Sequence, residues 1–524
     1  MHFLTSSQIR TWDQRAIAER GVRGLALMNR AGAAVARVVA RVAAQGREQN
    51  VWLIAGRGNN GGDAFVAARC LHEDGFLVRV RMTCAPEALR GDARGAWEQM
   101  QQAGVSFQAW TEVSAWLADK GADQPCGGVI VDGLLGTGSE GSPHGVVAAA
   151  IRWITRARGR CRVVAIDIPS GLNADTGDSG DPIVRADVTV SLAAPKTGFR
   201  NPKAWEWPGH VEVVDIGLPP DLQPEPEAGD GVQFIGAPEL VPWMAPRGRG
   251  THKGHYGHVL VIGGSHGLSG APALAAMGAL RSGAGLVSAA VPETCLPWMA
   301  ALAPSAMAHP IRCERGAMTA AALAAGIRPV LAFDVVVAGP GMSVGEGTAR
   351  MVEELLRGSS SRLVLDADAL TVLDGRVEQL RRTASGPSVI ITPHPGEAAR
   401  LLGVTSAVIQ ADRNAAAQEL AARSQAVVVL KGAGTLVAAP AGARHLNLTG
   451  NPGLASGGTG DVLAGLIAGL WAQGLPPLDA ARLAVYLHGT AGDLGVWQSG
   501  EQALVADDLG RWLGPACRWL EAMG

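Results

Sequence analysis

The sequence is poor in lysine and in aromatic residues, and it lacks the marks of several protein classes. Only five of its 524 residues are lysine, and Phe, Trp and Tyr together make up 4%. No run of about 18 apolar residues occurs, which argues against a bilayer-spanning helix. The net charge of −2 gives no long-range attraction to nucleic acid or to an anionic membrane. Neither of these partners is therefore expected.

The cysteines and the N-terminal residues indicate in which cellular compartment the protein is expected. The seven cysteines are scattered and form no C-x-x-C pair, so neither a zinc site nor a disulfide framework is predicted. The opening segment "MHFLTSSQIRTWDQ" has no basic region followed by an apolar core, so we do not expect a signal peptide. A cytoplasmic location is expected.

The chain is too long for one compact core, because domains usually hold about 100–200 residues. A hydrophobic content of 47% with 18% charged residues is typical of globular domains. Residues 217–231, "GLPPDLQPEPEAGDG", are rich in proline, acid and glycine and have little to bury, which predicts a linker. We therefore expect two domains, residues 1–225 and residues 226–524.

Short apolar runs alternate with helical segments in both halves, which predicts parallel sheets covered on both faces. The expected fold class is α/β, with two doubly wound domains. In the first half the strands are expected at 51–55, 77–82, 128–135, 162–168 and 187–192, with helices at 63–74 and 145–158. In the second half they are expected at 258–264, 286–291, 335–341, 363–370, 388–394 and 426–432, before a helical region from about residue 461.

The loop "AGRGNNGGDAF" (residues 55–65) follows the first predicted strand and matches G-x-G-x-x-G. Such a turn before a helix suits a phosphate, but the dinucleotide fingerprint also needs an acid about 20 residues later. Arg79 and Arg81 lie there instead, which leaves an NADP dehydrogenase open. The tandem Asn59 and Asn60 followed by Asp63 indicate contacts with a polar substrate or a cation.

Two further loops follow predicted strands. "VDGLLGTG" places Asp132 at a strand end, and "AIDIPSGLNADTG" places Asp167 and Ser170 at another. Each acid alone could simply cap a turn. Because the carboxyl ends of parallel strands face the ligand crevice, the three loops together predict one site.

The segments "GRGNNGGD", "VDGLLGTG" and "DIPSG" closely resemble the NAD(P)H-hydrate epimerase family, over most of residues 1–220. The resemblance implies a Rossmann-like three-layer sandwich that is not a dehydrogenase. It implies a potassium site at Asn60, Asp132 and Ser170. Implied contacts with the hydrated nucleotide lie at Asn59, Asn60, Gly61, Gly62, Asp63, Gly136, Thr137, Gly138, Ser139, Glu140, Gly141, Ser142 and Asp167.

The chemistry of the substrate agrees with these residues. NADHX and NADPHX are reduced nicotinamides that have added water at C6, and inverting that centre needs a group that moves a proton. Asp167 is the candidate general acid–base. Oxygen ligands alone would indicate only a hard cation, so potassium comes from the resemblance. Ala64 departs from the family, which usually has glycine there, and a methyl group should be tolerated at a helix start.

The motif "GGTGD" (residues 457–461) dominates the second half. It opens a helix, so its glycines can present N–H groups to a phosphoryl group that is being transferred. Asp461 is placed to accept a proton from an attacking hydroxyl. No G-x-x-x-x-G-K-[ST] occurs, so a P-loop NTPase is not predicted.

Other segments of this half carry polar residues after predicted strands. Lys431 begins a glycine turn suited to a nucleotide, and His394 and Glu397 follow another strand. A metal site is not expected at the histidines of "THKGHYGHV", because their spacing fits neither a strand face nor a helical i, i+4 pair. These histidines are His252, His255 and His258.

The motifs "THKG", "VIGGS", "SGAPALAA", "ALRSGAGLV", "AGPG", "TPHPGE", "KGAGT" and "GGTGD" occur in this order. Over residues 240–515 they resemble the NAD(P)H-hydrate dehydratase family, which has a ribokinase-like fold. The family usually has a further glycine within "GPGMS" (339–343). Implied substrate contacts lie at Ala271, Gly341, His394 and Asp461, and implied adenine-nucleotide contacts at Lys431, Gly432, Ala433, Gly434, Thr435 and Gly460.

The two resemblances together imply one repair enzyme. The first half would interconvert the R and S epimers of NAD(P)HX, and the second would dehydrate the S epimer with ADP, releasing AMP and phosphate. Asp167 and Asp461 would be catalytic, with potassium in the first site and Mg²⁺ accompanying the nucleotide. A homo-oligomer is expected by resemblance. The alternative is a ribokinase-like small-molecule kinase with a non-catalytic N-terminal binding module.

Overall fold

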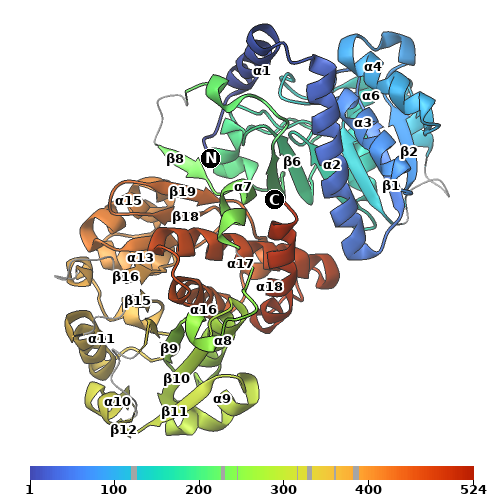
Figure 1. The fold of residues 1–524 in the computed structure, drawn as a ribbon. Coiled ribbons are helices and arrows are strands. Elements are labelled where there is room, and N and C mark those ends of the chain that lie inside the picture. Colours follow the sequence, from blue (N-terminus) through green and yellow to red (C-terminus); the bar gives the residue numbers. More distant parts are fainter. Residues whose placement is uncertain are drawn as a thin grey trace. The chain divides into compact units, whose positions relative to one another are not determined.

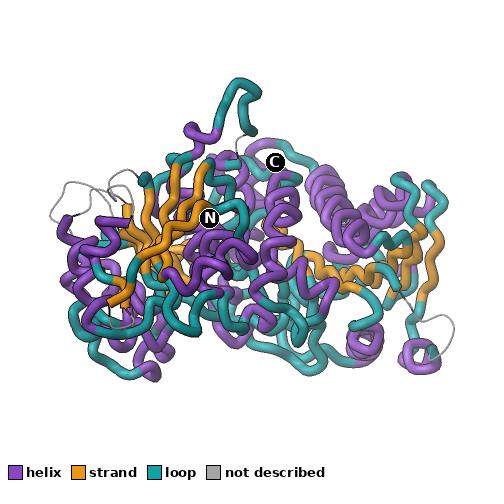
Figure 2. Tube along the Cα trace, turned by 90° about the horizontal axis from the view of Figure 1, so that it is seen from below, coloured by secondary structure: helices purple, strands orange, loops and turns teal. Residues whose placement is uncertain are grey.

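The computed structural model describes residues 1–119, 125, 127–225, 231–244, 246–314, 317–326, 333–358, 362–381 and 389–523. The chain divides into two compact units, Met1–Gly229 and Asp230–Gly524. Each contains a twisted sheet with helices on both sides (Figures 1 and 2). No helix in the described part of the chain combines the length and the apolar character needed to cross a bilayer.

The N-terminal unit contains a seven-stranded parallel sheet in the order β3-β2-β1-β4-β5-β6-β7. The strand order reverses between β1 and β4, the switch point where doubly wound sheets bind ligands. The strands are β1 (Asn50–Ala55), β2 (Leu77–Met82), β3 (Ser106–Ala109), β4 (Val129–Gly133), β5 (Arg162–Ile166), β6 (Val188–Leu192) and β7 (His210–Val214).

Apolar layers on both faces explain why these strands are continuously hydrophobic. One face packs against tryptophans of α5 and α6, with Trp52, Trp116 and Trp153 in one buried cluster. The other carries α3, against which α2 and α4 pack (Figure 1). The helices are α1 (Ser6–Arg20), α2 (Gly24–Gly46), α3 (Asn59–Glu73), α4 (Gly91–Gln102), α5 (Val113–Ala118) and α6 (Gly145–Ala157).

The C-terminal unit contains a ten-stranded mixed sheet in the order β11-β10-β9-β14-β15-β16-β17-β18-β19-β8. Strands β9–β11 and β14–β17 are parallel, whereas β18 is antiparallel to both of its neighbours. The strands are β8 (Val232–Phe234), β9 (His258–Ile262), β10 (Leu286–Pro292), β11 (Met307–Ile311), β14 (Val335–Ala338), β15 (Arg362–Leu365), β16 (Val389–Ile391), β17 (Val427–Leu430), β18 (Thr435–Ala438) and β19 (Arg444–Asn447). A separate hairpin pairs β12 (Cys313–Glu314) with β13 (Ala317–Met318).

Small residues bring two helices of this unit into close contact. A Cβ at Gly465 of α16 would lie 1.8 Å from the carbonyl oxygen of Ala275 in α8, so only glycine permits this packing. The helices are α7 (Ala237–Leu240), α8 (Gly270–Arg281), α9 (Leu296–Leu302), α10 (Ala320–Gly326), α11 (Glu346–Gly358), α12 (Asp368–Thr371), α13 (Pro395–Leu402), α14 (Ser406–Ala411), α15 (Arg413–Ser424), α16 (Thr459–Ala472), α17 (Pro477–Ser499) and α18 (Ala506–Glu521).

The doubly wound α/β architecture predicted from the sequence is confirmed, with two differences in detail. The sequence did not predict β3, β7, β8, β11, β12, β13, β18 or β19, all of which are short strands. The predicted linker, residues 217–231, is only partly a loose connection between the domains. Leu218 and Leu222 are buried against Trp12 of α1 and Leu27 of α2, so the expectation that this segment has little to bury was wrong there. Its residues 226–230 lie outside the described part.

Candidate active sites

The three N-terminal loops predicted to form one site follow β1, β4 and β5, which are adjacent in the sheet. Close backbone packing explains two glycines of the first loop. A Cβ at Gly56 would lie 2.0 Å from the carbonyl oxygen of Leu134, and one at Gly61 would lie 2.0 Å from that of Gly56. Gly56 therefore lets the β1 loop approach the β4 loop, and Gly61 lets the start of α3 pack on the β1 loop itself. Ala64 is fully buried against Gly133, so its methyl group is accommodated.

A buried group of oxygen atoms joins the three loops. The Ser170 hydroxyl donates to Asp132 Oδ1 at 2.7 Å, and the Ser170 amide donates to Asp132 Oδ2 at 2.8 Å. Asn60 Nδ2 donates to the carbonyl oxygen of Leu135 at 2.8 Å, and the Leu135 amide donates to Ser170 Oγ at 2.9 Å. Asp132 also accepts from the Leu134 amide, as a turn-capping aspartate would. The structure thus brings Asn60, Asp132 and Ser170 together.

Asp132 is a carboxylate in an apolar setting with neutral partners. Its side chain is fully buried, and burial raises its pKa to about 6, although its bonds from Ser170 and Leu134 act in the opposite direction. A buried carboxylate is costly unless a cation or a proton neutralises it. Together with the amide oxygen of Asn60, the hydroxyl of Ser170 and the Leu135 carbonyl, it forms a donor set of the kind that hard cations prefer.

Asp167 is held in an unusual backbone conformation beside a buried lysine. Its φ angle is +66°, in the left-handed region that residues with a side chain rarely adopt. Lys196 Nζ lies 2.5 Å from Asp167 Oδ1 and also donates to the carbonyl oxygen of Leu192 at 2.9 Å. The Leu192 amide donates to the same carboxylate at 3.2 Å. The lysine side chain has no solvent exposure, so Asp167 has a fixed, buried cationic partner.

Asp63, the fifth residue of α3, has a different electrostatic environment. Burial, the nearby charge of Asp167 and that of Asp13 together raise its pKa well above the ordinary value. The site therefore holds one buried carboxyl group whose pKa is raised and a second one paired with a lysine. Two carboxyl groups in such different surroundings are typical of acid–base sites.

Residues 136–142 form a partly exposed loop that begins at this site. A Cβ at Gly136 would lie 3.4 Å from the Asn60 side chain. Further along, the Ser142 hydroxyl accepts a hydrogen bond from the Asp181 amide at 3.3 Å. Every residue of this loop is partly or fully exposed.

The possibility that Arg79 and Arg81 bind a 2′-phosphate gains no support from Arg81. Its guanidinium lies 3.8 Å from the ring centroid of Trp110 and 2.7 Å from Asp119 Oδ2, and its side chain is only 4% exposed. Trp52 and Trp153 also lie against it. Arg81 is therefore part of the core of the unit.

The second site lies at the carboxyl ends of the C-terminal strands. The segment "GGTGD" opens α16, where the Thr459 hydroxyl donates to the carbonyl oxygens of Leu454 and Ser456, both at 3.0 Å. His488 Nε2 lies 2.9 Å from the Thr459 carbonyl oxygen, and burial lowers the pKa of this histidine to about 4. A neutral histidine therefore fixes the start of the helix.

Asp461 belongs to a cluster of charged groups at this edge. Burial and the negative charge of Asp366 raise its pKa to about 7, against the opposing effect of Lys431. Lys431 Nζ lies 2.6 Å from Asp366 Oδ1 and 4.0 Å from Glu397 Oε2. A Cβ at Gly460 would lie 3.2 Å from Lys431 Nζ, so "GGTGD" and "KGAGT" meet here. A carboxyl group with a pKa near 7 is suited to act as a general base.

His394 and Glu397 form the N-terminal cap of α13. Glu397 Oε2 accepts from the His394 amide at 2.7 Å, and His394 Nδ1 accepts from the Gly396 amide at 2.9 Å. Burial raises the pKa of Glu397 to about 7 and lowers that of His394. His394 remains about half exposed, so its ring can still contact a ligand.

The other predicted substrate contacts of this unit also lie together. A Cβ at Gly341 would lie 3.2 Å from that of Ala271 and 2.8 Å from the carbonyl oxygen of Leu268. Ser343, two residues further on, donates its amide hydrogen to Asp368 Oδ2 at 2.9 Å. These residues follow β9, β14 and β15, which are neighbours across the switch point of the sheet.

The three histidines near β9 do not converge on one point. His252 and His255 stack at 3.9 Å, and their Nδ1 atoms accept backbone hydrogen bonds, whereas His258 bonds to Ser288. Within the described residues, no three His, Cys, Asp or Glu side chains are arranged to hold a metal ion.

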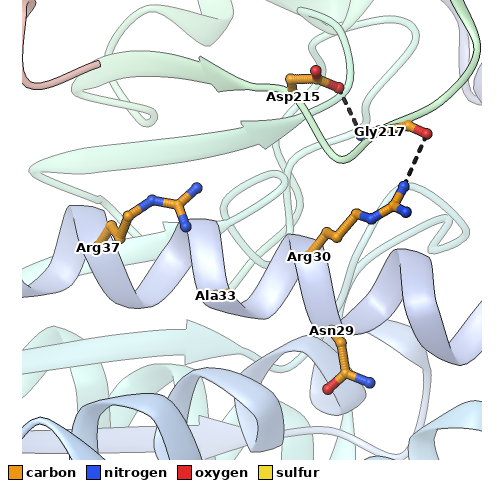
Figure 3. Close-up of a pocket in the computed structure, with 6 residues that line it drawn as sticks. All are labelled: Asn29, Arg30, Ala33, Arg37, Asp215 and Gly217. Atoms are coloured by element: carbon orange, nitrogen blue, oxygen red, sulfur yellow. Dashed lines mark hydrogen bonds between the residues drawn. The ribbon is translucent and has the colours of Figure 1, made fainter. Parts of the chain in front are cut away.

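A shallow hollow of about 420 Å³ lies between α2 and the segment after β7 (Figure 3). Arg30 donates to the Gly217 carbonyl oxygen at 3.2 Å, and the Gly217 amide donates to Asp215 at 2.6 Å. Its lining includes none of the predicted site residues. The arginines that line it are solvent-exposed, and we assign it no role in catalysis.

Sequence reasoning missed Lys196 and Asp366 as site residues. Asp366 follows β15 in "LVLDADAL", so an acid at a strand end could have identified it, as it did Asp132 and Asp167. Lys196 gave no comparable signal beyond the rarity of lysine, because it follows β6 by a turn and reaches Asp167 only through the fold.

Comparisons with known proteins agree with both halves. A family model described as NAD(P)H-hydrate dehydratase matches residues 259–513, and one described as YjeF-related protein N-terminus matches residues 24–198. The bifunctional NAD(P)H-hydrate repair enzyme of Moorella thermoacetica is 39% identical over 99% of this chain and 97% of its own length. The enzyme of that name from Escherichia coli is 34% identical over 96% of this chain and 92% of its own length.

A solved structure resembles the second half. It is a crystal structure of the ADP/ATP-dependent NAD(P)H-hydrate dehydratase from Bacillus subtilis, co-crystallised with ATP and Mg²⁺. The two chains are 34% identical with a TM-score of 0.50, and the match covers 55% of this chain and 99% of that one. Both resemblances drawn from the sequence motifs are thereby confirmed, and the chain belongs to the family of bifunctional NAD(P)H-hydrate repair enzymes.

Proposed function

We propose that this chain repairs hydrated NADH and NADPH by two reactions. The N-terminal domain, residues 1–225, interconverts the R and S epimers of NAD(P)HX. The C-terminal domain, residues 226–524, dehydrates the S epimer to NAD(P)H at the expense of ADP. The observation that carries the proposal is the presence, in one chain, of two separate acid–base clusters at the switch points of two doubly wound sheets.

Asp167 is the general acid–base of the epimerase, and Lys196 positions it. A carboxylate held by a buried ammonium stays available to take a proton near C6 of the substrate. Asp63, whose pKa is raised by burial and by the charge of Asp167, donates a hydrogen bond or a proton to the departing or returning oxygen. The loop of residues 136–142 and the amides of the first turn of α3 contact the dinucleotide.

Potassium fits the oxygen cluster beside this site. Asn60, Asp132 and Ser170 would hold it, and its charge would neutralise the buried Asp132 carboxylate. When bound, the ion supplies a fixed positive charge that orders the loops around the substrate phosphates. A potassium ion prefers oxygen donors and tolerates irregular geometry, which agrees with this mixture of carboxylate, amide, hydroxyl and carbonyl groups.

In the dehydratase, Asp461 takes the proton of the C6 hydroxyl as its oxygen attacks the β-phosphorus of ADP. A P–O bond forms to the hydrate while the bond to AMP breaks. The ring nitrogen then expels the phosphate from C6, and the loss of a proton from C5 restores the reduced nicotinamide. The N–H groups that open α16 stabilise charge on the phosphoryl group. Ala271, Gly341 and His394 contact the substrate.

The nucleotide is expected at "KGAGT", with Gly460 beside it, and Mg²⁺ is expected to accompany its phosphates. The Bacillus subtilis relative, described as ADP/ATP-dependent and co-crystallised with ATP and Mg²⁺, supports a nucleotide in this family. The choice of ADP by this chain stays a prediction. So do the cytoplasmic location and the homo-oligomeric state.

The test is the recovery of reduced-nicotinamide absorbance from a mixture of NADHX epimers, with ADP, with ATP and without nucleotide. We expect complete recovery that requires a nucleotide, and no recovery by Asp461→Asn. Recovery without nucleotide, or an unaffected Asp461→Asn variant, would contradict the dehydratase assignment. A rapid phase that stops at the S fraction would contradict the epimerase assignment and support the alternative of a non-catalytic N-terminal module.

A further inference from the structure

We propose that Arg413 is a positioning residue for the nucleotide: it holds the "KGAGT" turn with its backbone amides free to bind phosphate. This inference rests on the proposed nucleotide site and extends it to a residue outside the motif. Arg413 is the first residue of α15, and the turn it holds joins β17 to the antiparallel β18.

One guanidinium group gathers three carbonyl oxygens of the turn. Arg413 Nη2 donates to the carbonyl oxygens of Leu430 at 3.1 Å, Lys431 at 3.2 Å and Gly434 at 3.3 Å. Its Nη1 lies 3.1 Å from Gln410 Oε1. The three carbonyl oxygens share the two N–H groups of Nη2, while Nη1 bonds to Gln410. The planar guanidinium fixes both nitrogens relative to each other, which a flexible ammonium with one nitrogen does not reproduce.

The turn adopts a backbone conformation that this clamp explains. Gly432 and Gly434 have φ angles of +137° and +59°, which favour glycine. A Cβ at Gly432 would lie 3.0 Å from Arg413 Nη1, so the guanidinium packs directly against the backbone. The turn is therefore shaped around the arginine.

Holding the carbonyls on one side directs amides to the other. In a trans peptide the N–H of a residue points opposite to the preceding C=O, so the Gly432 amide faces away from Arg413. No acceptor for the amides of residues 432–434 lies among the residues that the structure describes. Consecutive free amides at a turn form an anion-binding concavity.

The charge of Arg413 adds to this effect. Burial lowers the pKa of the guanidinium, and no carboxylate among the described residues pairs with it. A half-buried cation directly behind free amides favours an anion in front of them. On this side of the site, the ligand that satisfies both features is a phosphate group of a nucleotide.

The test compares Arg413→Lys and Arg413→Met with Arg362→Lys. Arg362 is a matched control, since it is partly buried in the same sheet and donates to the Trp471 carbonyl oxygen at 2.8 Å, but it begins β15 at the opposite edge. ADP binding to the full chain is measured by calorimetry without hydrate, together with KM for ADP, KM for S-NADHX, kcat and the thermal midpoint.

We expect both Arg413 variants to weaken ADP binding and raise KM for ADP by about tenfold or more, with KM for S-NADHX unchanged and Arg362→Lys unaffected. Unchanged ADP binding in both variants would overturn the inference. So would a fall in kcat and thermal midpoint without a change in either ADP measure, because that indicates a purely structural role. Calorimetry distinguishes failure of this inference from failure of the proposed dehydratase function. A wild-type chain that binds ADP but does not dehydrate the hydrate would refute the proposed function and leave the role of Arg413 in ADP binding standing.

Discussion

Replacing Lys196 with methionine is expected to destabilise the N-terminal domain and to impair epimerisation. The methionine side chain has a similar length, so it largely fills the space, but it removes the cation that lies 2.5 Å from Asp167. It also removes the donor to the carbonyl oxygens of Leu192 and Ala194 and to the Ser191 hydroxyl. The substitution therefore leaves a carboxylate without its buried ionic partner.

The magnitude follows from the burial of the pair. Removing one partner of a buried ion pair costs about 3–5 kcal/mol, because the remaining charge is no longer compensated. The Lys196 side chain has no exposure and that of Asp167 is 13% exposed, so water can reach the carboxylate on one side. We therefore expect the lower end, a loss of about 3 kcal/mol in the free energy of unfolding. This corresponds to a fall of about 6–12 °C in the thermal midpoint of a domain of this size.

The assay is denaturant unfolding of the full chain, followed by the epimerisation rate of purified R-NADHX. Lys203→Met is the matched control, since Lys203 is exposed and should tolerate the change. We expect epimerisation by Lys196→Met to fall by about a hundredfold, because the acid–base group loses its orientation. A variant with wild-type stability and a wild-type epimerisation rate would refute the role given to this pair.

Three further predictions concern charge. At a pH well above 6, potassium should raise the thermal midpoint of the N-terminal domain, whereas at a pH well below 6 it should have no effect. The reason is that Asp132, with a pKa of about 6, loses its charge on protonation. Calorimetry in potassium and tetramethylammonium salts, with Asp132→Asn as control, checks this. The kcat/KM of the dehydratase for S-NADHX should fall as the pH drops below about 7, because Asp461 is then protonated; a rate flat from pH 8 to about 5 would contradict its role as base. Arg81→Lys should lower the free energy of unfolding by about 2 kcal/mol and leave the preference between NADHX and NADPHX unchanged. Arg79→Lys, at an exposed position, should change neither the stability nor the preference. Denaturation followed by tryptophan fluorescence measures the change in stability.

The sequence predicts the central strands and the loops between them well, because both carry local signals. Strands β1, β4, β5, β9 and β14 are short apolar runs that end in glycine or acid, and this pattern identifies the switch-point edge without a structure. Edge strands such as β3 and β11 lack such a pattern. Both strands are only partly buried, so they contain polar and exposed residues and lack the continuous apolar pattern from which a strand is predicted.

The sequence motifs did not identify site residues that are brought to the site only by folding. Lys196 and Arg413 lie outside every motif, and each is defined by groups that approach it only after folding. For Arg81 the sequence suggested a role that the structure does not support. Its position after the glycine loop suggested a phosphate contact, but its guanidinium is in contact with three tryptophans and Asp119 instead. Position along the chain predicts which loops form a site, whereas burial and pairing decide which side chains are free to act.

The most direct test of two repair reactions in one chain uses purified R-NADHX with ADP. The wild type should convert it to NADH, and neither Asp167→Asn nor Asp461→Asn alone should do so faster than the spontaneous rate. A mixture of the two variants should restore conversion, because the S epimer released by the epimerase of one chain can be dehydrated by the other. Conversion by Asp167→Asn alone at the wild-type rate would contradict the account, and so would the absence of conversion by the wild type.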